Sequence, residues 1–225
     1  MMNHRLLGFA TGLFYLFANS ACVTIPSMDF SAYHEAKPRS ILIIPIVNES
    51  VDVQAPTSVL TTLPHILGER GYYVFPVNTV KTLLEYEGLY EPAEVHAMPP
   101  QELADLFGAD AILYVKIHEW TAKYVFLQTT TEVNFEYRIV NRDGTNLWEA
   151  RKQLEYSSET DSSGNLFVDL IASAVSAAIE RADPNYLPLT RQANYQVFNT
   201  DDTAIPPGPY ATDYEDYYRS LKEKK

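Results

Sequence analysis

The chain has 225 residues and a formal net charge of −12, with 46% hydrophobic and 20% charged residues. This apolar content excludes a wholly disordered chain, and the length suits one domain with additional segments. The acidic surface would repel phosphates, so we expect no nucleic-acid partner. The single cysteine excludes an intrachain disulfide and a cysteine-rich metal site.

Residues 1–21 have the features of an export signal peptide. Arg5 supplies a positive start, residues 6–18 form an apolar run, and small residues then precede Cys22. The apolar run is shorter than the ~20 residues that a membrane-spanning helix needs, which favours a cleaved signal. Ser20, Ala21 and Cys22 resemble a bacterial lipobox, in which the cysteine carries diacylglycerol and the peptidase cuts just before it. We therefore predict that Cys22 is lipidated and that the lipid attaches the protein to a membrane.

One position of this motif leaves an alternative open. Asn19 stands where a lipobox usually has Leu, so ordinary signal-peptidase cleavage around residues 18–20 would give a soluble periplasmic protein. Val23 follows Cys22, and no aspartate marks the chain for inner-membrane retention. This favours the periplasmic side of the outer membrane. Acyl chains contribute about 0.8 kcal/mol per buried CH₂, so anchoring would not depend on the acidic surface.

Residues 22–39 are predicted to be a short polar tether, and residues 40–185 an α/β domain. Residues 40–47 form an Ile-rich apolar run that is typical of a strand buried on both faces, as in a parallel sheet. Residues 56–71 have helical spacing, with Pro56 in the first turn and Gly71 at the C-terminal end. Pro64 lies inside this helix and predicts a kink or a later start.

Strands and helices alternate through the next segment. Residues 72–77 predict a second strand, residues 78–87 a helix, residues 99–108 a short helix, and residues 111–117 a third strand. Gly88 and Pro92 are expected to end the helix over residues 78–87. This alternation is typical of right-handed βαβ crossovers.

The pattern then changes to that of antiparallel strands. Residues 131–140 alternate between apolar and polar side chains, as in a strand with one buried face. Residues 141–144 predict a hairpin turn in which Gly144 supplies a positive φ, and the returning strand runs from residue 147 to about residue 156. The third to fifth strands should therefore form a meander.

The end of the chain divides into two parts. Residues 166–181 predict an amphipathic helix whose many small residues allow close packing on the sheet or on another subunit. Residues 186–225 lose periodicity and contain a Pro-Pro-Gly-Pro run followed by several tyrosines, which predicts an extended or partly disordered tail. The expected fold is therefore α/β (α+β), a mixed five-stranded sheet in the order β-α-β-α-α-β-β-β-α with helices packed on it.

The loop after the first strand is the candidate binding site. It lies at the carboxyl end of a parallel strand, where open α/β sheets usually bind ligands. The polar residues there are Asn48, Glu49, Ser50 and Asp52, with Thr57 and Ser58 at the start of the next helix. The simpler interpretation is that these side chains end the strand and cap the helix. The alternative is a small polar ligand or partner site.

No residue pattern predicts catalysis, a cofactor or a metal. The histidines form no HExxH or His-x-His motif, and no nucleophile elbow, Walker motif or dinucleotide glycine pattern is present. His118-Glu119 at a strand end could bind a metal, but such a pair is more often solvated. Glu85, Glu87 and the acidic residues that follow are typical of a solvated face.

Several stretches resemble the neisserial-antigen-type lipoproteins, a family of unknown function. The longest is residues 37–53 (KPRSILIIPIVNESVDV), continued by residues 55–59. Shorter ones are residues 71–77 (GYYVFPV), 92–100 (PAEVHAMPP), 106–111 (LFGADA) and 147–150 (LWEA). The resemblance implies an outer-membrane lipoprotein whose domain is similar to the N-terminal domain of the periplasmic Tol-system protein. It also implies a homodimer, and a partner among the curli-secretion-type lipoproteins that build export channels.

Three functions are compatible with this sequence. The leading hypothesis is a non-catalytic assembly or scaffold lipoprotein of an envelope export complex. The second is a periplasmic small-ligand module that uses the loop of residues 48–52. An envelope hydrolase is the third and has the least support, since no residue pattern favours it.

Overall fold

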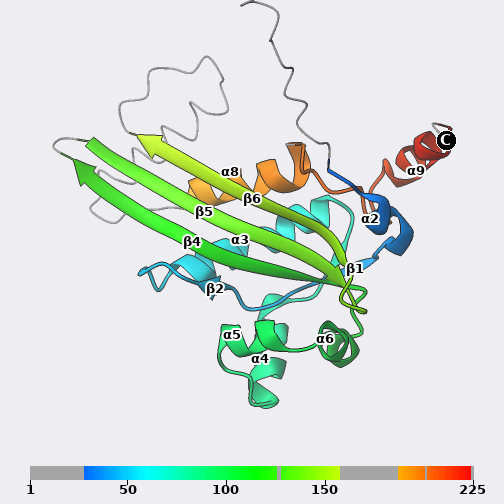
Figure 1. Ribbon diagram of the computed structural model, residues 1–225, viewed down its shortest axis with the longest axis horizontal. Helices are drawn as coiled ribbons and strands as arrows, with labels where there is room; N and C mark the ends of the chain where they lie inside the picture. The colour runs from blue at the N-terminus through cyan, green and yellow to red at the C-terminus, as the bar shows by residue number, and fades with distance from the viewer. Residues whose placement is uncertain (1–27, 126–127, 158–186, 201, 224–225) are drawn as a thin grey trace, which may run out of the picture.

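The computed structural model describes residues 28–125, 128–157, 187–200 and 202–223, which are built around an open mixed sheet (Figure 1). The strands are β1 Ser40–Ile43, β2 Val47–Asn48, β3 Tyr73–Val74, β4 Ala111–Val125, β5 Gln128–Asn141 and β6 Asn146–Ser157. The six-stranded sheet has the order β3-β1-β4-β5-β6, and β2 pairs with β4 beyond the end of β1. The expected mixed sheet is confirmed, with one strand more than predicted.

The predicted first strand is present but divided in two. All residues of β1 are buried, and β1 runs parallel to both β3 and β4, as its apolar sequence predicts. The register with β4 joins Ile43 to Leu113 but Val47 to Lys116, so one additional residue is accommodated between β1 and β2. The interruption contains Pro45, which has no N–H to donate to a neighbouring strand.

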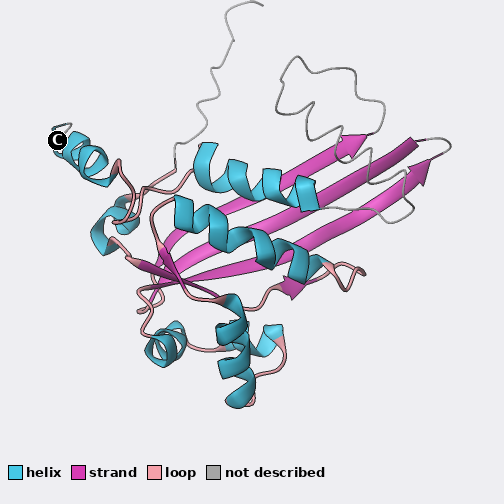
Figure 2. Ribbon diagram, turned by 180° about the vertical axis from the view of Figure 1, so that it is seen from behind, coloured by secondary structure: helices cyan, strands magenta, loops and turns pink. Residues whose placement is uncertain are grey.

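Two helices cover one face of the sheet. They are α3 Ala55–Glu69 and α8 Leu187–Tyr195, and they lie side by side across the meander in Figure 2. Val59, Leu63 and Leu67 of α3 recur at helical spacing and are fully buried. On the sheet, the inward residues of this core include Phe135, Tyr137 and Ile139 in strand alternation.

Among the described elements, helices cover the opposite face only at the end where the strands are parallel. Helices α4 Val77–Tyr86, α5 Pro92–Ala97 and α6 Pro100–Phe107 form a second core there, against alternate residues such as Leu42 and Ile112. Strands β4, β5 and β6 extend well beyond these helices (Figure 1). On this second face, described polar residues of the meander such as Asn134, Arg138 and Gln153 are half-buried or exposed, as the apolar–polar alternation of its sequence predicts.

The predicted meander is confirmed. Strand β5 pairs antiparallel with both β4 and β6. The turn between β5 and β6 contains Gly144 at φ 82°, the left-handed region that the sequence predicts for this position. Asn141 Oδ1 accepts hydrogen bonds from the backbone N–H groups of Asp143 and Thr145, which holds the turn closed.

The prediction of an extended tail over residues 186–225 is wrong. The described part of this segment contains α8, the π-helical turn η2 Gln196–Thr200 and the helix α9 Tyr214–Glu223. Leu189, Ala193, Phe198 and Ile205 are at most 3% exposed and belong to the main core. The apolar residues of this proline-containing segment are few and irregularly spaced. They give no helical or strand periodicity, so the sequence did not predict their burial.

A buried chain of polar groups fastens the C-terminal segment to the rest of the core. The Tyr137 hydroxyl donates to Asn194 Oδ1, and Asn194 Nδ2 donates to Thr62 Oγ1 at 2.6 Å. Thr62 in turn donates to the Val59 carbonyl oxygen at 2.8 Å. These bonds join β5, α8 and α3 and satisfy polar groups that water cannot reach.

The predicted tether needs correction, whereas the predicted end of the helix over residues 78–87 is confirmed, since α4 ends at Tyr86. Helix α2 Ser31–Ala36 lies within residues 22–39, and its Tyr33 is fully buried, so the folded body begins earlier than residue 40. Helix α5 begins at Pro92, because proline suits the first turn of a helix as well as it ends the preceding one. The signal peptide, Cys22 and the predicted helix of residues 166–181 lie outside the described residues.

Candidate functional site

The loop after β2 is held together mainly by its own side chains. Asn48 Nδ2 donates to the Asp52 carbonyl oxygen at 2.8 Å, while Asn48 Oδ1 accepts from the Ser50 backbone N–H and hydroxyl. Asp52 Oδ1 accepts from the Gln54 N–H at 2.7 Å, one residue before α3 begins. The simpler interpretation from the sequence, strand termination and support of the next helix, therefore accounts for Asn48, Ser50 and Asp52.

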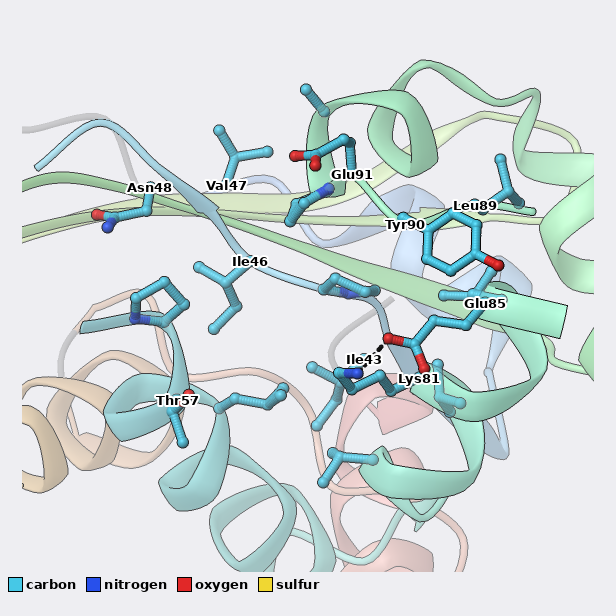
Figure 3. Close-up of a pocket in the computed structure, with 18 residues that line it drawn as sticks. Ile43, Ile46, Val47, Asn48, Thr57, Lys81, Glu85, Leu89, Tyr90 and Glu91 are labelled. Atoms are coloured by element: carbon cyan, nitrogen blue, oxygen red, sulfur yellow. Dashed lines mark hydrogen bonds and ion pairs between the residues drawn. The ribbon is translucent and has the colours of Figure 1, made fainter. Parts of the chain in front are cut away.

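A mostly apolar pocket of about 460 Å³ lies beside this loop (Figure 3). Its walls come from residues 43–48, the start of α3, helix α4 and the segment that leads into α5. Of the predicted site residues, Asn48 and Thr57 line the pocket, whereas Glu49, Ser50, Asp52 and Ser58 do not. The structure therefore moves the candidate site from the loop itself to the hollow beside it.

The pocket lies where parallel α/β sheets usually bind ligands. Strand β3 reaches only to Val74, so no described strand lies beside residues 44–48 on the side away from β4. Helix α4 follows β3 and forms the facing wall on this side. The hollow between this helix and residues 43–48 lies at the carboxyl end of the parallel strands. The strand order predicted from the sequence pointed to this same edge of the sheet.

Few polar groups reach the pocket. Lys81 and Glu85 form an ion pair four residues apart on α4, and Glu91 lies on the opposite rim (Figure 3). The predicted solvated acidic face is thus divided, because Glu85 and Glu91 line the pocket while Glu87 does not. The remaining walls are largely Ile, Val, Leu and Pro side chains, and such a surface suits the apolar part of a ligand.

A row of alternating charges crosses the exposed face of the sheet next to the pocket. Glu49 accepts from His118 Nδ1 at 2.7 Å and pairs with Lys116 at 3.3 Å. His118 Nε2 lies 3.1 Å from Glu136, which also pairs with Arg151 on β6 at 2.5 Å. His118 thus lies between the carboxylates of Glu49 and Glu136. In the part of the chain that the structure describes, no group of three or more His, Cys, Asp or Glu residues could hold a metal ion.

Replacing Glu136 with Gln is expected to weaken the pH dependence of stability. Hydrogen bonds from His118 and Arg151 lower the pKa of Glu136, so its ionised form stabilises the fold above the ordinary pKa of 4.5. That contribution is lost as the pH falls through the lowered pKa. We expect an effect of about 1 kcal/mol or less, because Glu136 is 36% exposed and solvent screens the pairs.

The measurement is urea unfolding at neutral pH and at a pH well below 4.5, the ordinary pKa of this carboxyl group. The wild type and the Glu136→Gln variant should differ at neutral pH and converge in acid. Glu87→Gln is the matched control, because Glu87 is exposed at the end of α4. A difference that persists unchanged in acid would contradict the linkage.

Three comparisons relate the chain to known proteins. A family model described as "Putative lipoprotein GNA1162-like" matches residues 28–210. "Putative lipoprotein NMB1124/NMB1162" from Neisseria meningitidis serogroup B is 36% identical over 173 residues, which are 76% of this chain and 78% of the relative. The crystal structure of lipoprotein GNA1162 from Neisseria meningitidis has a TM-score of 0.54 at 34% identity, covering 64% of this chain and 99% of that one.

The matched range bears on how the molecule is organised. Residues 28–210 include both cores and the pocket, while helix α9 and residues 1–27 lie outside the range. Within the described parts of the chain, no helix is both long and apolar enough to span a bilayer. The solved relative supports the observed fold as well as the family resemblance that the sequence carries.

Proposed function

The chain belongs to the GNA1162-like lipoprotein family, and on this basis we propose that lipid on Cys22 anchors it to a membrane, where it serves as a non-catalytic assembly component of the envelope. The observation that carries the proposal is family membership together with a cysteine placed directly after the small residues Ser20 and Ala21. Two or three acyl chains on one residue are sufficient for stable anchoring.

The position of α2 supports a short distance between body and membrane. Only residues 23–30 separate Cys22 from Ser31, where the first described helix begins. A fully extended segment of that length reaches at most roughly 30 Å. Tyr33 is buried in the main core, so the chain is already fixed to the body just after this segment. An anchored body would therefore act on partners close to the lipid surface.

The assembly role is supported by the chemistry of the described residues. The charged groups next to the pocket pair with one another in a row across the strands, and the pocket walls are largely apolar. Such an arrangement suits recognition rather than bond cleavage. The partners that we propose are a second copy of the chain and a curli-secretion-type lipoprotein, at the periplasmic side of the outer membrane.

The Cys22→Ser variant is expected to move almost entirely from the membrane fraction to the soluble fraction. Serine cannot form the thioether to diacylglycerol, so the anchor is lost while the folded body is unaffected. Cell fractionation with immunodetection measures the change, and mass spectrometry of the mature wild-type chain should find an acylated residue 22. The Ser20→Ala variant keeps a small residue before the cysteine and serves as the control.

Two outcomes would contradict the proposal at different points. A Cys22→Ser chain that still fractionates with membranes, or a mature chain that begins elsewhere without lipid, rules out the anchor. If the wild-type chain is recovered alone after mild crosslinking and gentle extraction, the assembly role is ruled out while the anchor stands.

A second candidate function rests on the 460 Å³ pocket, which favours a small-ligand module. A ligand that binds only the folded chain raises its stability by RT ln(1 + [L]/Kd), about 2.7 kcal/mol at one hundred times Kd. A thermal-shift screen of the Cys22→Ser chain should therefore detect a ligand. The exposed Thr57→Trp variant would obstruct the rim of the pocket and should abolish the shift, whereas an equal shift in this variant would place the ligand elsewhere.

A further inference from the structure

Arg138 has a different environment from the other cations on the exposed face of the sheet. Lys116 pairs with Glu49, and Arg151 pairs with Glu136. The Arg138 guanidinium instead lies over the ring of Tyr114, 4.8 Å from its centre. Its register partner on β6 is Glu149, which accepts from Asn146 Nδ2. Among the described residues no carboxylate is within ion-pair distance of Arg138, so its charge is available to an anion from solution.

Arg138 lines a second hollow, of about 350 Å³, which adjoins the first. Its lining includes Tyr114, Lys116 and Glu136 from the sheet, and Ala93 and His96 from α5. Val47 and Ala93 belong to the linings of both hollows. Figure 3 shows Val47 and Ile46 pointing to opposite sides of their segment, with Ile46 directed into the apolar pocket. The two hollows are therefore neighbours across Val47.

We propose that the two hollows together bind an amphiphile with an apolar body and a terminal carboxylate. The body lies among the aliphatic side chains of the larger pocket, and the carboxylate lies against Arg138. This inference rests on the second proposed function and names its ligand class. A planar guanidinium can donate two parallel N–H bonds to a carboxylate, a geometry that a lysine cannot provide.

The charges around the larger pocket determine the orientation of the ligand. Glu91 lies on its rim and Glu85 is paired with Lys81, so a carboxylate left in this pocket would meet Glu91 without a free cation. At net charge −12 the protein as a whole repels anions, and a local cation is needed to hold one. Arg138 supplies that cation on the far side of Val47.

His96 lines the second hollow and is bonded to Pro45, which lines the first. Its Nε2 donates to the Pro45 carbonyl oxygen at 2.8 Å, and burial lowers its pKa. The ring is therefore neutral near pH 7 and adds no second charge at this point. Selectivity for the carboxylate then depends on Arg138, since Lys116 is already engaged by Glu49.

Titration calorimetry of the Cys22→Ser chain with three probes tests the proposal. Decanoate has both a body and a carboxylate, decanol lacks the charge, and acetate lacks the body. Decanoate should bind at least tenfold more tightly than either of the others. The Arg138→Gln variant should bind decanoate about tenfold more weakly and lose the preference over decanol, whereas Arg142→Gln, an exposed control in the hairpin turn, should match the wild type.

A second pair of variants tests the location. Ala93 is exposed on α5 at the junction of the hollows, so Ala93→Trp should block binding, while Ala97→Trp on the same helix should not. Equal binding of decanoate and decanol, or full binding by either Arg138→Gln or Ala93→Trp, overturns the proposal. If the thermal-shift screen finds a different ligand that Thr57→Trp excludes, the ligand-binding function stands and only the amphiphile is rejected. None of these outcomes bears on the proposed lipid anchor, which membrane fractionation of the wild type tests separately.

Discussion

The Phe198→Ala variant is expected to lose about 3–5 kcal/mol of unfolding free energy, because a large buried side chain is replaced by a methyl group. Phe198 is 0% exposed. Its ring lies edge-on to Tyr137 with centroids 5.4 Å apart, and it packs on Trp148 at 5.0 Å. The substitution removes aromatic contacts to β5 and β6 at once, and the rigid meander cannot collapse to fill the space.

The measurement is urea unfolding followed by tryptophan fluorescence, since Trp148 lies against the altered site. Tyr195→Ala is the matched control three residues earlier, because Tyr195 is 48% exposed. We expect that control to change stability by about 0.5 kcal/mol or less. Equal, small effects of the two variants would show that residues 187–200 contribute little to the core, contrary to the structure.

The Gly71→Ala variant is expected to lose about 2–5 kcal/mol, from two effects at one position. Gly71 has a φ of 86°, a conformation that an alanine adopts at a cost of about 1–2 kcal/mol. A Cβ built on Gly71 would also overlap the backbone of Ala211. The Gly71 carbonyl oxygen accepts from the Tyr210 N–H at 3.0 Å, so the two segments cannot separate without losing this bond.

Gly88→Ala separates these two effects. Gly88 has nearly the same φ, 85°, but no heavy atom lies within 4 Å of the position a Cβ would take. Its substitution should therefore cost only the backbone part, about 1–2 kcal/mol. Urea midpoints of both variants against the wild type give the comparison. Equal losses would mean that the contact between residues 71 and 211 adds nothing to stability.

The close approach at Gly71 also explains how the end of the chain is fixed. Arg70 donates from its side chain to the Ile205 carbonyl oxygen at 2.8 Å, and the Tyr72 hydroxyl donates to the Pro206 carbonyl oxygen at 2.6 Å. Residues 206, 207 and 209 are prolines without N–H groups, so this segment cannot form a regular backbone ladder, and side chains of Arg70 and Tyr72 satisfy two of its carbonyl oxygens instead. A segment that can form neither a helix nor a central strand is thereby ordered.

Sequence reasoning succeeded where a local pattern determines the structure. The Ile-rich run before Pro45 predicted a buried parallel strand, and the alternation in residues 131–140 predicted a half-buried antiparallel one. Gly144 predicted the turn that joins this antiparallel strand to the returning strand β6. These patterns are local because backbone geometry fixes which side chains share a face within a few residues.

The pocket could be predicted only in part. The rule for the carboxyl ends of parallel strands pointed to the edge where the hollow lies, and Asn48 and Thr57 line it. The residues that form most of its walls come from α4 and the segment before α5, which no motif marks. A concave surface depends on how separate elements pack against each other. The spacing of residues within one element does not predict that packing.

By itself, the sequence determined the mixed sheet with its meander and the family resemblance that the comparisons confirm, while the export signal and the lipid on Cys22 stay predictions. Only the tertiary structure decided that Leu189, Ala193, Phe198 and Ile205 belong to the core, that β1 and β2 are separate, and that Arg138 faces a second hollow. The physical reason is that local periodicity reports which face of an element is apolar. Burial of an irregular segment and the meeting of distant side chains depend on contacts between elements far apart in the chain.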